Sequence, residues 1–362
     1  MIRFGIVGGG WRTEFYLRAA QALGKDRARV TGLAMRSPEK AALMERRFGV
    51  KTCGSWRELL KDDPAFIVVA LPWQPMADLV RGIVSECDIP VLCETPIAPD
   101  EEQTREMYRF LTWKKARVQV AEQYFMQPYH RAVKSIIDSG VIGEVTDLYL
   151  SMMHGYHGVS ILRTYLGTGL MPVTLSGRRF TTRVTRTCGR NGLDKGGELI
   201  TMTRDDVLFE YDDGRYARYE FSDEQYFSGI RSRTVRINGT RGEIADDTVR
   251  YINDEGDCVT EKLVRADLGQ YSDLQGYSLR GLMFGGKYVY KNPFAEKKLS
   301  DNCRLSDDEL AVAEMLLHMQ EYADGGKEFY PLAEACHDTV LSNALKHAAE
   351  GRTVRVEGLE WM

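Results

Sequence analysis

Short apolar runs alternate with amphipathic stretches through the first third of the chain. The runs have the pattern of buried strands, and the stretches between them space their apolar residues as helices do. We expect strands at Ile2–Val7, Val30–Met35, Phe66–Leu71, Val91–Cys93 and Val118–Ala121, and helices at Glu14–Leu23, Pro38–Phe48, Gln74–Ser85 and Glu101–Trp113. This alternation is typical of βαβ units, so an α/β domain with a doubly wound parallel sheet is predicted at residues 1–121.

The pattern changes after Ala121. One helix is expected at Tyr129–Asp138, followed by alternation of period two, which is typical of antiparallel strands with one covered face. The expected strands are Val207–Tyr211, Tyr216–Phe221, Val235–Ile237 and Val249–Ile252, the first two joined by a turn at Asp212-Asp213-Gly214. We therefore expect a second, α+β domain with a large open, mostly antiparallel sheet at residues 122–362.

Two helices are expected near the C-terminus. Ser306 and Glu309 form a capping box that predicts a helix through Ala323. The last helix should bury one stripe, made by Leu332, Cys336, Val340 and Ala344. Residues 267–302 fit neither period and are expected to form a long loop. Within them, Gly276–Gly286 could cover a binding site or lie between subunits.

Composition excludes several classes of protein. The 362 residues are 43% apolar and 28% charged, as in a soluble globular protein large enough for two domains. A net charge of −4 provides no basic field for binding nucleic acid. We expect no membrane span. Seven cysteines without a Cys-x-x-Cys pair fit reduced thiols, so a cytoplasmic location is expected.

A glycine-rich turn ends the first apolar run. Its residues are Gly8, Gly9 and Gly10. Gly8 would make the tight turn, Gly10 would let phosphates approach the backbone, and the helix opening at Trp11 or Arg12 would point its positive end at them. Thr13 occupies the third glycine position of the motif, so an ordinary strand-to-helix turn stays an alternative to a dinucleotide site.

The end of the second strand bears on the choice of coenzyme. Sites that prefer NAD usually place a carboxylate there for the ribose hydroxyls, whereas this chain has Met35, Arg36 and Ser37. A guanidinium can pair with a 2′-phosphate, so NADP is favoured and NAD is the alternative. Ser37 before Pro38 could instead cap the next helix.

Several motifs occur in a recognisable order. They are Gly8-x-Gly10, Arg36–Ala41, Ala70-Leu71-Pro72, Val91–Pro96, Glu122-Gln123-Tyr124, Gly140–Val145, His157 and Gly239–Gly242. The sequence resembles the glucose–fructose oxidoreductase/inositol dehydrogenase (Gfo/Idh/MocA) family. The resemblance implies NAD(P)-dependent oxidation or reduction of a small-molecule sugar or polyol. It also implies a homo-dimer or homo-tetramer formed through the C-terminal sheet.

Departures from that family concern the expected catalytic pocket. Thr95 replaces the lysine of the Glu-Lys-Pro motif that lies beside the nicotinamide. Met153 and Ser160 replace two carboxylates near His157, and Met76 replaces a histidine. These changes remove a cation and two acids, and they leave open a regulator or scaffold that binds nucleotide without turnover.

Oxidising an alcohol requires a group that accepts the hydroxyl proton. A threonine hydroxyl can only relay a proton, whereas histidine ordinarily titrates in the physiological range. His157 is therefore the candidate acid–base group, with Thr95 and Tyr124 beside it; a loop histidine that only packs is the alternative. His154-x-x-His157 lacks a third ligand nearby, so no metal site is expected.

Further residues are expected to contact the coenzyme because they follow predicted strands. They are Leu71, Pro72, Trp73, Glu94 and Gln123. Trp73 could equally be a core aromatic, and Glu94 a structural carboxylate. Arg163 could bind an anionic substrate, although a surface arginine is the expectation.

Overall fold

A six-stranded parallel sheet forms the N-terminal part of the protein. The structure, a computed structural model, describes residues 1–189, 192–268, 278–295 and 305–358. The sheet order is β3-β2-β1-β4-β5-β6, so the chain reverses direction across the sheet between β1 and β4. Its strands are β1 (Ile2–Val7), β2 (Ala28–Ala34), β3 (Thr52–Cys53), β4 (Phe66–Val69), β5 (Val91–Cys93) and β6 (Val118–Val120). The predicted parallel, doubly wound sheet is confirmed, and ligands bind such sheets at the carboxyl edge where the order reverses.

The helices of this part also agree with the prediction apart from their ends. They are α1 (Trp11–Leu23), α2 (Pro38–Phe48), α3 (Trp56–Leu59), α4 (Trp73–Glu86) and α5 (Glu101–Lys114). Ser37 caps α2, its hydroxyl accepting the Lys40 N–H at 3.4 Å. β3 and α3 were not predicted because such short elements show no periodicity.

The C-terminal part is built on a nine-stranded sheet. Its order is β16-β15-β14-β13-β7-β12-β11-β8-β20, and only the β7–β12 pair is parallel. The strands are β7 (Val145–Ser151), β8 (Val173–Thr185), β11 (Leu199–Tyr211), β12 (Tyr216–Phe221), β13 (Thr234–Gly239), β14 (Gly242–Ala245), β15 (Thr248–Ile252), β16 (Cys258–Lys262) and β20 (Val354–Val356). The predicted open, mostly antiparallel sheet is confirmed. β9 (Cys188–Gly189) and β10 (Gly192–Leu193) form a separate small hairpin.

Two predictions in this part were wrong. The segment around His157 is not a loop, because helix α7 (Gly155–Leu166) begins two residues before it. Residues 267–302 are not a featureless loop either, since β17 (Val264–Leu268), β18 (Ser278–Phe284) and β19 (Lys287–Lys291) form a three-stranded sheet. Gly276 and Tyr277, which belong to the predicted covering segment, lie outside the described residues.

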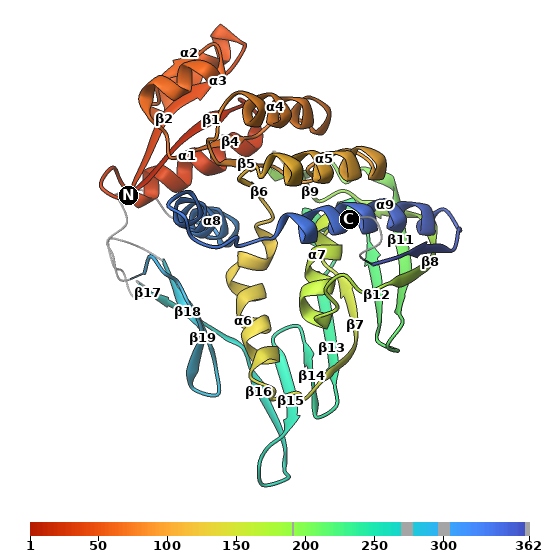
Figure 1. Cartoon of the computed structure of the whole chain (residues 1–362). Coiled ribbons are helices and arrows are strands. Elements are labelled where there is room, and N and C mark those ends of the chain that lie inside the picture. The colour runs from red at the N-terminus through yellow and green to blue at the C-terminus, as the bar shows by residue number, and fades with distance from the viewer. Residues whose placement is uncertain (190–191, 269–277, 296–304, 359–362) are drawn as a thin grey trace.

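Helices of the C-terminal part connect the two sheets. α6 (Pro128–Asp138) precedes the large sheet, while α8 (Asp307–Ala323) and α9 (Leu332–Ala349) lie between that sheet and the N-terminal part (Figure 1). α8 contacts α1, and α9 contacts α5, α7 and β8. α9 is therefore buried on most of its surface rather than along one stripe, which corrects the prediction.

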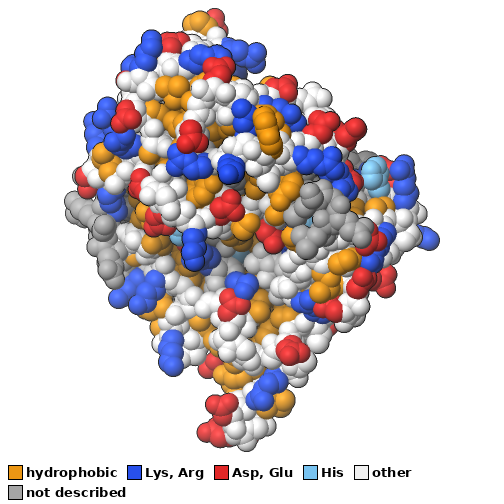
Figure 2. Space-filling view, in the orientation of Figure 1, with side chains coloured by type: hydrophobic (Ala, Val, Ile, Leu, Met, Phe, Trp, Pro, Cys, Tyr) orange, Lys and Arg blue, Asp and Glu red, His pale blue; other side chains and the backbone are white. Residues whose placement is uncertain are grey.

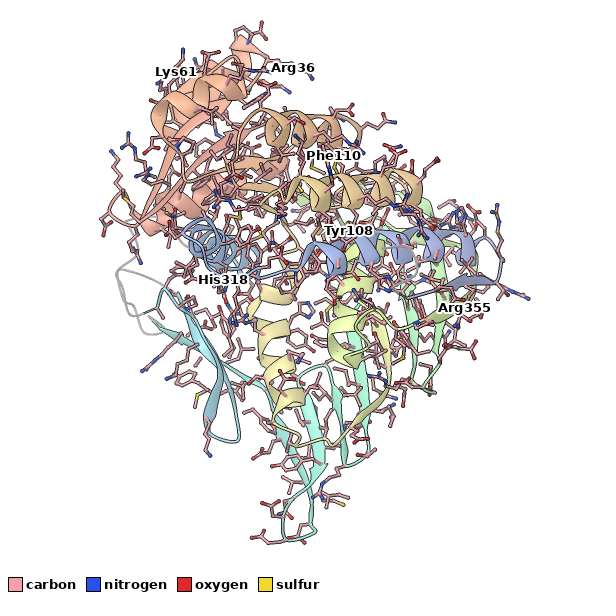
Figure 3. All side chains as sticks on the ribbon, in the orientation of Figure 1. Arg36, Lys61, Tyr108, Phe110, His318 and Arg355 are labelled. Atoms are coloured by element: carbon pink, nitrogen blue, oxygen red, sulfur yellow. The ribbon has the colours of Figure 1, made fainter. Side chains whose placement is uncertain are left out.

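Charged side chains of both signs are intermingled on the face of the molecule shown in Figure 2. Many of them pair, as Arg355 of β20 does with Asp212 at 2.6 Å (Figure 3). Among the described residues, no helix combines the length and apolar character needed to cross a membrane.

Candidate active site

The glycine turn between β1 and α1 is shaped by two different requirements. Gly8 has φ +124°, and a Cβ there would overlap the carbonyl oxygen of Ala70, so only glycine fits. Gly10, the N-cap of α1, has no atom within 4 Å of the position of a Cβ and no side-chain cap. The packing of the protein thus explains Gly8 but not Gly10. Open space at an uncapped helix N-terminus suits an anion.

Thr13 replaces the third glycine of the motif without disturbing the turn. Its side chain is fully buried, and its hydroxyl donates to the carbonyl of Gly8 at 3.1 Å. The hydrogen bond satisfies a buried polar group and ties the first helical turn to the end of β1.

Arg12 and Glu94, both expected at the coenzyme, are bonded to each other. Arg12 Nε donates to Glu94 at 3.2 Å and Nη1 to Asp308 of α8 at 2.9 Å, while the Tyr16 hydroxyl also donates to Glu94. Burial lowers the pKa of Arg12, but Glu94 and Asp308 outweigh it and raise that pKa far above its ordinary range. Nη2 of Arg12 is buried with no hydrogen-bond partner among the described residues, a group that a bound phosphate could satisfy.

Asp308 links this cluster to the end of β6. Its second oxygen accepts the side-chain amide of Gln123 at 3.2 Å. Gln123 is buried and its amide is directed to α8. The network therefore joins the first turn of α1 to the residues on either side of Gln123, which are Glu122 and Tyr124.

The Glu122 carboxylate and the His157 ring form a buried pair. Nδ1 of His157 lies 2.6 Å from Oε2 of Glu122, whose side chain is fully buried, and Oε1 of Glu122 accepts the Tyr124 N–H at 3.0 Å. A carboxylate can only accept, so in the neutral ring Nδ1 carries the proton and Nε2 is left with a lone pair. This is the arrangement of an oriented general base.

Tyr219 of β12 and Tyr226, which follows that strand, fix the turn before α7. The Tyr226 hydroxyl accepts the His154 N–H at 2.9 Å, and the Tyr219 hydroxyl accepts the Gly155 N–H at 2.8 Å. A Cβ at Gly158 would overlap the Tyr219 ring, so glycine there lets α7 approach the sheet closely. These contacts hold His157 in the first turn of the helix.

Tyr124 lies directly against His157. Their ring centroids are 4.4 Å apart, and the Tyr124 hydroxyl bonds to that of Tyr226. Burial raises the pKa of Tyr124, so its hydroxyl stays protonated near neutral pH and can donate to a ligand. His154 is also close, with its ring centroid 4.8 Å from that of His157. In the described part of the chain, no three histidine, cysteine or acidic side chains are placed to hold a metal ion.

Comparison with known proteins agrees with this geometry. Residues 2–122 match the Gfo/Idh/MocA profile, described as an oxidoreductase family with an NAD-binding Rossmann fold. The N-terminal third of the chain is therefore similar to the Gfo/Idh/MocA family. It is 28% identical over 146 residues to inositol 2-dehydrogenase of Rhizobium meliloti, and 28% identical over 152 residues to levoglucosan dehydrogenase of Pseudarthrobacter phenanthrenivorans. Each match covers 40% of this chain but only 43% and 39% of those relatives.

Solved structures show that the fold extends over the whole chain. Levoglucosan dehydrogenase in complex with NADH and L-sorbose superposes with a TM-score of 0.68 at 18% identity, covering 99% of both chains. An oxidoreductase from Agrobacterium radiobacter in complex with NAD+, L-tartaric acid and magnesium also gives 0.68 at 18% identity, covering 98% of both chains. At such identities the likeness establishes the fold alone.

Arg36 lies at the outer rim of the N-terminal part (Figure 3). Its side chain is exposed, and among the described residues no carboxylate pairs with it. Ser37 is occupied as the cap of α2, as the sequence suggested. The guanidinium of Arg36 is therefore the positive group at this edge that could pair with a phosphate of a coenzyme.

The residues after β4 and β5 lie side by side, because Val69 pairs with Cys93. Leu71 and Thr95 are half-buried, and Pro72 and Trp73 are exposed at the start of α4. Trp73 is 51% exposed, so it is not a core aromatic. An exposed aromatic at the carboxyl edge of the sheet is available for contact with a ring system.

Arg163 is not a surface residue, and that expectation was wrong. It is 5% exposed, donates to Asp338 at 2.5 Å and pairs with Glu334, and it also bonds the Gly169 carbonyl. Its guanidinium holds α7 to α9 and is not available to a substrate. The helical position alone could not reveal partners that follow it by more than a hundred residues.

Sequence reasoning did not pair Glu122 with His157. A signal existed, because a carboxylate directly after a buried strand lies at the ligand-binding edge of such a sheet. No comparable signal marked Tyr226, which lies in a short 3-10 turn (Asp223–Tyr226) after β12 and reaches the site only in the folded protein.

Proposed function

We propose that this protein is an NAD(P)-dependent oxidoreductase that transfers a hydride between the coenzyme and a sugar, polyol or related small alcohol or carbonyl compound. The observation that carries the proposal is the Glu122–His157 pair, which is linked through Gln123 and Asp308 to the helix N-terminus beside Gly10. Such a reaction needs a coenzyme that carries the hydride, a site that binds the coenzyme phosphates, and a group that accepts the substrate proton. The helix N-terminus beside Gly10 would be the phosphate site, and His157 would be the proton acceptor.

The protein residues would act on the substrate as follows. Bound nicotinamide supplies hydride acceptance or donation at its C4 atom. In the oxidative direction, Nε2 of His157 takes the hydroxyl proton while Glu122 keeps the ring oriented and stabilises the charge it gains. The Tyr124 hydroxyl donates a hydrogen bond to the reacting oxygen. The proton returns from Nε2 of His157 in the reductive direction.

His157 also accounts for activity despite the replaced motif residues. Thr95 cannot accept a proton, and Met153 cannot orient a histidine. Glu122 provides the carboxylate that Met153 lacks, from the segment just after β6 rather than from the segment before α7. The alternative, a nucleotide-binding regulator without turnover, rests on the same two replacements. A steady-state assay of reduced-nicotinamide absorbance over a panel of sugars and polyols distinguishes them, since coenzyme binding without any turnover would favour the regulator.

We further propose NADP as the preferred coenzyme, on the exposed charge of Arg36 and the lack of a carboxylate beside it. Arg36→Glu should raise the Kd of NADPH by at least about ten-fold, the loss of one charge-assisted phosphate contact, and leave the Kd of NADH unchanged or lower. Fluorescence titration of each coenzyme measures both constants, with Arg46→Glu at the far end of α2 as control. Equal effects on both coenzymes would contradict the assignment and favour NAD.

The large sheet is proposed as the surface that forms homo-dimers or homo-tetramers. Val207 and Phe209 of β11 are buried toward α9, so the alternate residues of β8 and β11 lie on the opposite face. That face carries Phe180, 47% exposed, and the half-buried Ile200 and Met202.

Light scattering should give a multiple of the 41.1 kDa chain mass, and Phe180→Glu should shift it toward the single chain. Leu43→Glu, on the exposed side of α2, is the control. A native chain that is monomeric at micromolar concentration would refute the proposed interface.

A further inference from the structure

Lys346 of α9 lies beside the candidate active site without a charged partner. Its Nζ is 5.8 Å from the centroid of the Trp73 ring, at the start of α4. Its one polar contact among the described residues is to Asn343 Oδ1 at 3.5 Å, a neutral amide at the limit of hydrogen bonding. No carboxylate in the described part of the chain forms an ion pair with it.

Independent contacts show that this part of α9 faces the His157 segment. Ser342, one helical turn before Lys346, is so close to Gly155 that a Cβ there would lie 3.2 Å from the Ser342 hydroxyl. α7 and α9 are also in contact. Lys346 is exposed and lies one helical turn after Ser342, so we place its ammonium near Trp73 and on the side of α9 that faces the first turn of α7.

His154 lies near this group and is exposed. The protein around its ring, then His157 and then Lys346 nevertheless lower the pKa of His154 to about 3. His154 is therefore neutral near pH 7 and adds no charge of its own. Arg233 also contributes positive charge, its guanidinium 5.6 Å from the Tyr226 ring centroid.

Nearby carboxylates do not cancel this positive charge. Glu122 is bonded to His157, and Asp308 is paired with Arg12 at 2.9 Å. The site thus combines a proton acceptor with an exposed ammonium that has no counter-ion among the residues the structure describes. Such a group gains most from a ligand that brings a negative charge.

We propose that Lys346 is a substrate-binding residue and that the substrate is a polyhydroxy carboxylate, a sugar acid. Its carboxylate pairs with the Lys346 ammonium while a hydroxyl of the same molecule reaches Nε2 of His157. The inference rests on the proposed function only for the hydroxyl that reacts at His157. The ion pair between Lys346 and the substrate carboxylate can be tested by binding alone, without turnover. A single flexible ammonium suits a carboxylate, whereas phosphate sites usually add backbone amides or a guanidinium fork.

The test compares acids with their neutral counterparts on the full chain saturated with reduced coenzyme. Calorimetric titrations use gluconate against glucitol, galactonate against galactitol, and glucuronate against glucose. At least one acid should bind about ten-fold or more tightly than its neutral counterpart, as expected for a hydrogen-bonded ion pair. Lys346→Met should remove that preference, and Lys346→Arg should retain most of it. Lys25→Met, a distant exposed lysine, is the control.

The outcomes separate this inference from the proposed function. It is overturned if no acid is preferred, or if Lys346→Met weakens acid and neutral ligand equally. Binding of acids that depends on Lys346, without turnover of any of them, would sink the enzymatic proposal and leave the binding site standing. If the protein turns over neutral sugars and Lys346→Met does not change their turnover, the enzymatic proposal stands and the proposed role of Lys346 is overturned.

Discussion

Replacing Gly10 with alanine should weaken binding of the reduced coenzyme without destabilising the protein. The added methyl group meets no protein atom within 4 Å, and the backbone at Gly10, with φ −85°, accepts any residue. It would occupy the space proposed for the pyrophosphate. Overpacking of this kind costs roughly 1–3 kcal/mol, so the Kd should rise about ten- to a hundred-fold. Fluorescence titration measures the Kd, and thermal unfolding without coenzyme should give an unchanged Tm.

Gly8→Ala is the matched control because it should lower the stability of the protein itself, which Gly10→Ala should leave unchanged. A Cβ at Gly8 would overlap the Ala70 carbonyl in a backbone conformation that disfavours side chains, so the free protein itself should be destabilised. If Gly10→Ala binds coenzyme as the native chain does, the anion site does not lie at this helix N-terminus.

Replacing His157 with glutamine should lower kcat by about 10²- to 10⁴-fold, the usual contribution of a general acid–base group. Glutamine fills a similar space but cannot accept a proton, so the Kd of the coenzyme should stay within about two-fold of its native value. His318→Gln on α8, which pairs with Glu321 (Figure 3), is the control and should keep native kcat. An unchanged kcat in the His157 variant would show that another group moves the proton.

Glu122→Gln tests the orientation of the base separately. The two oxygens of Glu122 accept from His157 and from the Tyr124 N–H, and an amide can accept at only one of these positions. Either the turn loses a backbone hydrogen bond or His157 changes its protonated nitrogen. In both cases kcat should fall with little change in KM, because Glu122 acts through His157. A fall in coenzyme affinity alone would contradict this role.

The sequence predicts the architecture because each element carries its own local signal. Strand periodicity, the Ser306–Glu309 capping box and the glycine turn were each visible within a few residues, and each is confirmed. The reason for Gly8 also followed from sequence, since only glycine tolerates the conformation of that turn.

The site was only partly predictable because its contacts join distant residues. His157 was singled out from the sequence, but its hydrogen bond to Glu122 and the helix that carries it became visible only in the fold. Lys346 lies nearly 200 residues further along the chain, and nothing in its surroundings in sequence indicates Trp73 as a neighbour. Arg163 was misjudged for the same reason, since burial of a charged residue depends on partners brought in by tertiary structure.

The most direct test is a crystal structure of the full chain with bound NADPH. The account predicts the pyrophosphate on the backbone amides that follow Gly10, and the nicotinamide ring between Trp73 and His157, with its C4 atom facing the open side of the imidazole. A coenzyme bound elsewhere, or a nicotinamide turned away from His157, would contradict it.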